Sequence, residues 1–168
     1  MAKRLCVYGI FSALCIALGF AERLISFDFI APGIKLGLAN AVVLLLIRFG
    51  DVKGAFAVNT VRILLSGLLF SAPSVLIYSL SGGLVSTAVM ALVSKSKRLG
   101  VVGFSILGAA THNITQLLVA WILLGRGVLY YSPFLLLAAL LSGSLTGVLA
   151  GIASKRLKFN KIMPDIKG

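Results

Sequence analysis

The chain is a succession of apolar runs, most of them as long as a helix must be to cross the hydrocarbon core of a bilayer, about 17 to 25 residues. Since 60% of the 168 residues are hydrophobic and 12% are charged, a water-soluble globule could not hide this apolar surface. The sequence therefore predicts an all-α membrane protein with six transmembrane helices, of which the second is short for a span. The runs lie at residues 5–23, 35–49, 53–71, 74–94, 100–124 and 133–153.

The positive charges are distributed unevenly between the two sides of such a bundle. Six helices place both termini on one side, and by the positive-inside rule the side richer in Lys and Arg is cytoplasmic. We expect a six-helix transmembrane domain over residues 1–154 and a basic cytoplasmic tail over 155–168 that follows the lipid headgroups. The opposite loops hold Arg23, Lys35 and Arg126. The cytoplasmic side holds Lys3, Arg4, Arg48, Lys53, Lys95, Lys97, Arg98, Lys155, Arg156, Lys158, Lys161 and Lys167.

The net charge of +12 would suggest a nucleic-acid partner in a soluble protein. Here the cations lie between apolar runs, and no basic segment interleaved with aromatic residues offers a surface for nucleic acid. We therefore expect these charges to contact the anionic headgroups of the lipid bilayer and no nucleic acid.

The sequence contains few groups that could carry catalysis. Its acids are Glu22, Asp28, Asp51 and Asp165, and none lies in the middle of a predicted span. It has no acidic pair to hold Mg²⁺ at a diphosphate, no G-x-x-x-x-G-K-[ST] phosphate loop, and a single histidine, His112, without the partners of a zinc site. We expect no catalytic residues, no metal and no cofactor. The absence of a mid-membrane carboxylate also disfavours a self-sufficient proton- or sodium-coupled carrier.

One cation lies inside a span. In FAVNTVRILLSG, residues 56–67, Arg62 lies about 13 Å from the start of the third predicted helix, near the bilayer centre. An arginine there costs about 2.5 to 3.5 kcal/mol on insertion scales, so it should face the protein interior or a water-filled cavity with a partner. Because no acid is expected in the middle of a span, an anionic ligand is one source of the counter-charge.

Other polar side chains fall at a similar or more outward depth. Asn59 lies one turn before Arg62 on the same helix face, and THNITQ at residues 111–116 brings three more polar groups to the fifth helix. The alternative to ligand binding is that these groups form interhelical hydrogen bonds with one another, and the protonation of the histidine stays open. The predicted substrate-binding residues are Arg62, Asn59, His112, Asn113, Gln116, Asn40 and Lys35.

Two rows of small residues recur at every fourth position, where they let helix backbones approach closely. For the row in the sixth helix we favour ordinary packing inside the bundle. The row in the first helix is open to packing or to docking of a partner. The rows are Ala13, Ala17 and Ala21 in the first helix and Gly143, Gly147 and Gly151 in the sixth.

Four segments together resemble a known family. They are PGIKLGLAN at 32–40, NTVRILLSGLLFS at 59–71, YSLSGGLVS at 78–86 and GAATHNITQLLVA at 108–120. In this order they resemble the Gx transporters, small membrane proteins also labelled heptaprenyl diphosphate synthase component I. That family is similar to the substrate-binding S components of energy-coupling factor (ECF) transporters, which have six helices with both ends inside.

The resemblance implies a function. An S component captures a vitamin-like solute from outside, and a transmembrane scaffold subunit with two cytoplasmic ATPases drives the solute across. S components dock on the scaffold through a row of alanines in the first helix, so the resemblance implies that Ala13, Ala17 and Ala21 dock there. The synthase label conflicts with the sequence, which lacks the aspartate-rich motif of prenyl diphosphate synthases.

We therefore expect a non-enzymatic, substrate-binding subunit in the cytoplasmic membrane of a prokaryote. Its ligand would be a small anionic or amphipathic solute that is vitamin-like, quinone-related or isoprenoid-related, and the sequence does not choose among these. One alternative is a membrane scaffold without transport activity, serving prenyl or quinone biosynthesis or a redox assembly. Another is a membrane enzyme acting on lipid diphosphates, which the missing acids disfavour.

Overall fold

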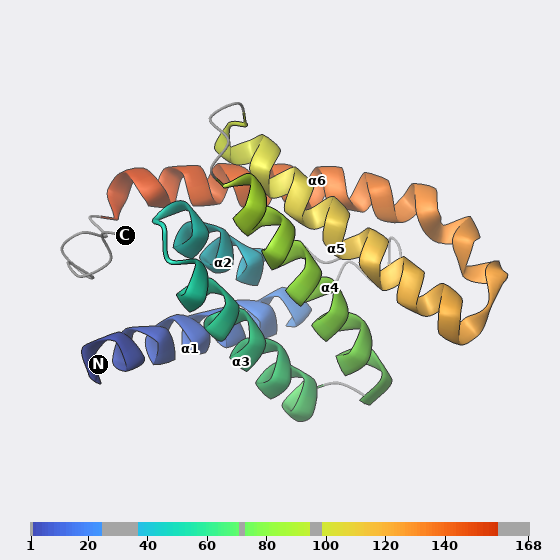
Figure 1. The fold of residues 1–168 in the computed structure, drawn as a ribbon, viewed down its shortest axis with the longest axis horizontal. Helices are drawn as coiled ribbons and strands as arrows, with labels where there is room; N and C mark the ends of the chain where they lie inside the picture. The colour runs from blue at the N-terminus through green and yellow to red at the C-terminus, as the bar shows by residue number, and fades with distance from the viewer. Residues whose placement is uncertain (1, 25–36, 71–72, 95–98, 158–168) are drawn as a thin grey trace.

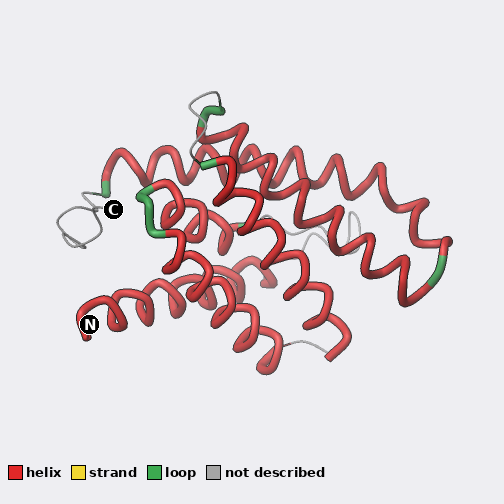
Figure 2. The backbone as a smooth tube through the Cα atoms, viewed as in Figure 1, coloured by secondary structure: helices red, strands yellow, loops and turns green. Residues whose placement is uncertain are grey.

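The computed structural model is all-helical over the residues that it describes, which are 2–24, 37–70, 73–94 and 99–157 (Figure 2). The six predicted runs each contain a helix, so the predicted all-α class is confirmed. The elements are α1 (Ala2–Leu24), α2 (Leu38–Arg48), α3 (Val52–Phe70), α4 (Pro73–Val93), α5 (Val101–Leu124), the 3₁₀-helix η2 (Arg126–Tyr131) and α6 (Ser132–Arg156) (Figure 1).

Five helical segments in the described part of the chain are long and apolar enough to cross a membrane, and the chain is a multi-pass membrane protein. The remaining helix, α2, has 11 residues and is about 16 Å long. This length is roughly half the thickness of the hydrocarbon core. α6 continues to Arg156, beyond the predicted end at residue 153, and residues 158–168 of the predicted tail lie outside the described residues. The five segments are Arg4–Glu22, Val52–Phe70, Val75–Val93, Val101–Leu124 and Arg126–Arg156.

The short helix α2 forms the centre of the bundle. Six consecutive residues, 42–47, are buried, so α2 is apolar and covered on all sides. It packs against α1, α3, α4 and α6. The burial of α2 explains how a helix too short for an ordinary span retains a strongly apolar sequence.

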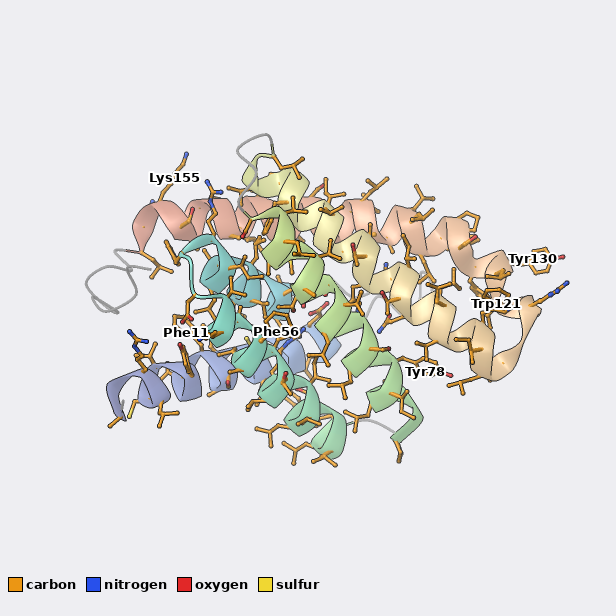
Figure 3. All side chains as sticks on the ribbon, viewed as in Figure 1. Phe11, Phe56, Tyr78, Trp121, Tyr130 and Lys155 are labelled. Atoms are coloured by element: carbon orange, nitrogen blue, oxygen red, sulfur yellow. The ribbon has the colours of Figure 1, made fainter. Side chains whose placement is uncertain are left out.

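The helices run back and forth so that α1 begins and α6 ends at the same end of the molecule (Figure 1). Lys155 lies at that end, whereas Tyr130 and Trp121 lie at the opposite end of the long α5–α6 hairpin (Figure 3). Tyr130 is 86% exposed. Exposed Tyr side chains are typical of a membrane–water interface.

A buried carboxylate fixes the start of α3. Asp51 precedes the helix, and its Oδ1 accepts a hydrogen bond from the backbone N–H of Gly54 at 2.8 Å, which is the arrangement of a helix N-cap. Its Oδ2 accepts a hydrogen bond from the hydroxyl of Tyr8, also at 2.8 Å. This carboxylate therefore joins α1 to the α2–α3 turn near the end at which the chain begins.

The glycine row of α6 lies against α5, as predicted for two of its three members. A Cβ added to Gly143 would lie 2.7 Å from the Cα of Ile106, and one added to Gly147 would lie 2.7 Å from the Cα of Val102. These distances are shorter than real Cβ contacts, so only glycine allows the two backbones to approach this closely. Gly151 has open space at the same position.

Candidate functional site

Arg62 lies midway along α3 and faces the interior of the bundle, where it is half-buried. Its Nε donates a hydrogen bond to Oδ1 of Asn59 at 2.8 Å. Its Nη2 donates to Oδ1 of Asn40 at 2.6 Å. Because Asn40 belongs to the first turn of α2, these bonds join the middle of α3 to the buried start of α2.

Asn59 is 1% exposed, and its amide group is engaged by the protein on both sides. The oxygen accepts the bond from Arg62, while Nδ2 donates to the backbone oxygen of Gly83 at 3.0 Å and to Oγ1 of Thr87 at 2.9 Å. Gly83 and Thr87 both belong to α4. Asn59 therefore orients the guanidinium and joins α3 to α4, as the predicted alternative of interhelical hydrogen bonds describes.

Hydrogen bonds from two other helices, α1 and α6, hold the start of α2. Gly37 precedes the helix with φ 76° and ψ 24°, a left-handed conformation that glycine adopts without steric cost. Its N–H donates to Oε1 of Glu22 on α1 at 2.6 Å. Its carbonyl oxygen accepts from the backbone N–H of Asn40 at 2.8 Å and from Oγ1 of Thr146 on α6 at 3.5 Å. These bonds set the position from which Asn40 reaches Arg62.

One acid influences Arg62 from the last turn of α1, outside the middle of a span. Glu22 is 9% exposed and interacts electrostatically with Arg62. In the sequence Glu22 stands near the end of an apolar run and suggests an interfacial position. The inner face of α1, however, packs against α2 and α3, and this turns the last turn of α1 towards the start of α2.

The guanidinium of Arg62 has one edge occupied and one edge available within the described part of the chain. Nε and Nη2 form the occupied edge, and Nη1 donates to none of the described residues. A guanidinium presents planar two-pronged edges that fit a carboxylate or a phosphate. The arrangement can therefore bind an oxyanion at the Nη1–Nη2 edge. We call Glu22, Gly37, Asn40, Asn59, Arg62 and Thr87 the Arg62 cluster.

His112 and Gln116 lie together on α5, where they face α4. A Cβ added to Gly82 of α4 would lie 3.0 Å from Cγ of Gln116 and 3.1 Å from Cε1 of His112. The neighbouring Gly83 faces Asn59 on α3 instead. α4 packs against both α3 and α5, so His112 and Gln116 lie together on its α5 side, while the hydrogen bonds of Arg62 go to Asn40 and Asn59.

The remaining predicted substrate-binding residues are not part of this arrangement. Asn113 points to the other neighbour of α5, because its Nδ2 donates to the backbone oxygen of Leu135 on α6 at 2.8 Å. It joins α5 to α6 near the end that carries Tyr130. Lys35 lies outside the described residues.

The alanine row of α1 lies on the outer surface of the bundle. Ala13 and Ala17 are exposed and Ala21 is half-buried. The opposite face of α1 is the packed one, where the thiol of Cys15 donates to the backbone oxygen of Ala39 on α2 at 3.6 Å. Packing against another helix of this chain therefore does not account for Ala13 and Ala17.

The sequence profile of one protein family covers most of the chain. The family described as heptaprenyl diphosphate synthase component I matches residues 11–153. The chain belongs to that family. The predicted resemblance to it is confirmed, and the matched range contains the whole Arg62 cluster. No curated protein and no solved structure gives a significant match.

In this member of the heptaprenyl diphosphate synthase component I family, sequence reasoning missed three polar residues of the site region. Thr87 and Thr146 carried no signal beyond being hydroxyls on apolar helices, which are common. Glu22 did carry one, because it stands directly after the alanine row on the turn that continues the buried face of α1. Within the described residues, no three His, Cys, Asp or Glu side chains gather where they could hold a metal ion.

Proposed function

We propose that this protein is the substrate-binding subunit of an ECF-type transporter in the cytoplasmic membrane of a prokaryote. In this proposal the chain has the six-helix S-component arrangement, with both termini cytoplasmic. It captures a small anionic or amphipathic solute at the Arg62 cluster and delivers it with a scaffold subunit and two cytoplasmic ATPases. The protein itself carries no catalytic activity.

The observation that carries the proposal is the state of the Arg62 side chain. Two asparagine oxygens hold its Nε–Nη2 edge at 2.8 and 2.6 Å, so the guanidinium is fixed before any ligand arrives. Fixing a binding group in advance lowers the entropy lost on binding. Within the described residues the second edge has no hydrogen-bond acceptor, which supports a role in holding the carboxylate or phosphate of a solute.

The proposal divides the predicted substrate-binding residues by role. Arg62 contacts the anionic group, while Asn40 and Asn59 position Arg62. His112 and Gln116 contact a part of the solute farther along the α4–α5 interface.

The exposed alanine row supports docking of another membrane protein on α1. Small side chains allow a partner helix to approach the backbone closely, and this approach drives helix association where lipid removes the hydrophobic driving force. The partner in the proposal is the scaffold subunit, which contacts Ala13 and Ala17 on the lipid-facing side of the bundle.

The family description favours a second candidate function. It relates the chain to heptaprenyl diphosphate synthesis, which fits a membrane scaffold that binds biosynthetic enzymes without transporting a solute. A link to isoprenoids is compatible with both candidates, because an isoprenoid-related solute is also amphipathic. The two candidates differ in the proteins that accompany the chain.

Two measurements on the full chain test the proposal. Gentle solubilisation followed by native mass spectrometry should detect a retained small molecule in the parent protein and its loss from Arg62→Ala. Affinity purification from the native membrane should recover two ATPases and a membrane scaffold. Recovery of prenyl-synthesis enzymes without ATPases would contradict the transport proposal and support the second candidate.

A further inference from the structure

Glu22 is a buried carboxylate in a membrane protein, next to a site proposed to bind an anion. It belongs to the last turn of α1 and is 9% exposed. A carboxylate in such a place disfavours additional negative charge nearby, because like charges repel strongly where water is excluded. The Glu22 carboxylate therefore opposes the binding of an oxyanion at the neighbouring site.

The position of Glu22 is fixed by a backbone hydrogen bond. Oε1 accepts the N–H of Gly37 at 2.6 Å, and Gly37 is itself fixed by bonds to α2 and α6. This bond keeps the Glu22 carboxylate beside the start of α2.

Three hydrogen bonds, through Gly37 and Asn40, connect Glu22 to Arg62. The N–H of Gly37 reaches Glu22, and the carbonyl of Gly37 accepts the N–H of Asn40, whose side chain accepts Nη2 of Arg62 at 2.6 Å. The two charges also interact electrostatically. Hence any group bound at the Nη1–Nη2 edge of Arg62 lies within the field of the Glu22 carboxylate.

We propose that Glu22 sets the charge selectivity of the Arg62 cluster, so that the site takes a solute with a single negative charge, such as a carboxylate, and rejects a diphosphate. The inference rests on the proposed function, since it assumes that Arg62 binds an oxyanion. It names the substrate class of that site and separates the ligand from the diphosphate in the family's description.

The physical reason is the count of charges. The guanidinium and the Glu22 carboxylate offset each other, so a singly charged group gains its bidentate contact with Arg62 against one repulsion. A diphosphate brings several negative charges, each of which is repelled by Glu22, while the described residues of the cluster offer it one edge of the Arg62 guanidinium. Removing the Glu22 charge should therefore help diphosphate much more than it helps a carboxylate.

The test measures anion binding by the thermal unfolding of the detergent-solubilised full chain. Acetate and inorganic diphosphate are titrated at constant ionic strength without divalent cations, and the response of Arg62→Ala is subtracted to remove bulk salt effects. The central variant is Glu22→Gln, whose amide oxygen still accepts the N–H of Gly37. Asp51→Asn is the matched control, because Asp51 is also a buried carboxylate that accepts a backbone N–H but lies near the other end of the bundle.

In the expected result, Glu22→Gln shifts the ratio of half-saturating concentrations towards diphosphate by about tenfold or more relative to the parent, and Asp51→Asn leaves the ratio unchanged. An unchanged ratio in Glu22→Gln, with stabilisation that still depends on Arg62, overturns the selectivity inference and leaves the proposed site standing. No stabilisation dependent on Arg62 in either protein with either anion overturns the site, and the inference with it.

A second variant decides the matter if Glu22→Gln does not fold. Asn40→Asp keeps the oxygen that accepts Nη2 of Arg62 and adds a negative charge beside the guanidinium. It should shift the ratio in the opposite direction, with diphosphate weakened more than acetate. Equal weakening of both anions would contradict charge selectivity at this site.

Discussion

Nη2 of Arg62 donates to Oδ1 of Asn40 at a distance of 2.6 Å, across the contact between the middle of α3 and the first turn of α2. This bond joins the cation in the middle of α3 to the start of the short helix α2. The guanidinium is charged, so the bond belongs to the stronger class of hydrogen bonds. Together with the bond from Nε to Asn59 it holds Arg62 in one orientation, and Nη1 donates to none of the described residues.

Replacing Arg62 with Ala should remove ligand binding. Truncating one partner of a buried charge pair commonly costs about 2 to 5 kcal/mol, which weakens binding about thirtyfold to several thousandfold. Arg62→Lys should recover part of this loss, because an ammonium cannot form the planar two-pronged contact. The measurement is retention of the copurified small molecule by native mass spectrometry.

The matched control for this change is Arg126→Ala. Arg126 is an exposed arginine at the connection between α5 and α6. Arg126→Ala should retain the ligand fully. Equal retention by Arg62→Ala and the parent would contradict the proposed site. A folded parent beside an unfolded Arg62→Ala would assign Arg62 to stability instead.

Asn59→Ala should lower the free energy of unfolding, because Asn59 joins α3 to α4 and orients Arg62. Replacing it with Ala leaves Arg62 Nε without a partner and removes the two bonds that Asn59 donates to α4, and an unsatisfied buried polar group costs about 1 to 3 kcal/mol. The expected loss in the free energy of unfolding lies in that range, measured by chemical unfolding in detergent. Asn113→Ala removes a single bond to Leu135 and should cost less. The reverse order would contradict the bridging role of Asn59.

The helices could be predicted from the sequence because a bilayer dictates both their length and their composition. Each run without strong charges has to be helical, since lipid offers no partner for an open backbone. The prediction was least complete for α2, whose run looks like a short span. That run is short because residues 42–47 are buried on all sides by neighbouring helices, and this arrangement depends on contacts that a linear pattern does not contain.

The site could be predicted in part. Arg62 stands out because a cation in an apolar helix is costly, and its neighbour Asn59 follows from helical spacing. The position of His112 relative to Arg62 could not be predicted, because it depends on which helix lies between α3 and α5. The bond between Glu22 and Gly37 could not be predicted either, because it depends on how α1 packs against α2.

The glycine row of α6 should be sensitive at two of its three positions. Gly147→Ala places a Cβ 2.7 Å from the Cα of Val102, so α5 and α6 must separate, and overpacking of this kind typically costs about 1 to 3 kcal/mol. Gly143→Ala should behave similarly. Gly151→Ala meets no neighbour and should be neutral or stabilising by up to about 1 kcal/mol, because alanine favours the helix. Thermal unfolding of the three variants in one detergent makes the comparison, and equal destabilisation at all three would contradict the packing described here.

The exposed alanine row gives the test of docking. A Trp at Ala17 projects from the outer face of α1 and should separate any partner helix that relies on close backbone approach. Since Ala17 is exposed in the isolated chain, Ala17→Trp should fold normally and keep its ligand while losing the ATPases and the scaffold in affinity purification. Ile152→Trp provides the control, because Ile152 is 54% exposed on α6 and a bulky ring there should be accommodated by lipid. If the two Trp variants recover the same partners in the same amounts, α1 is not the docking face.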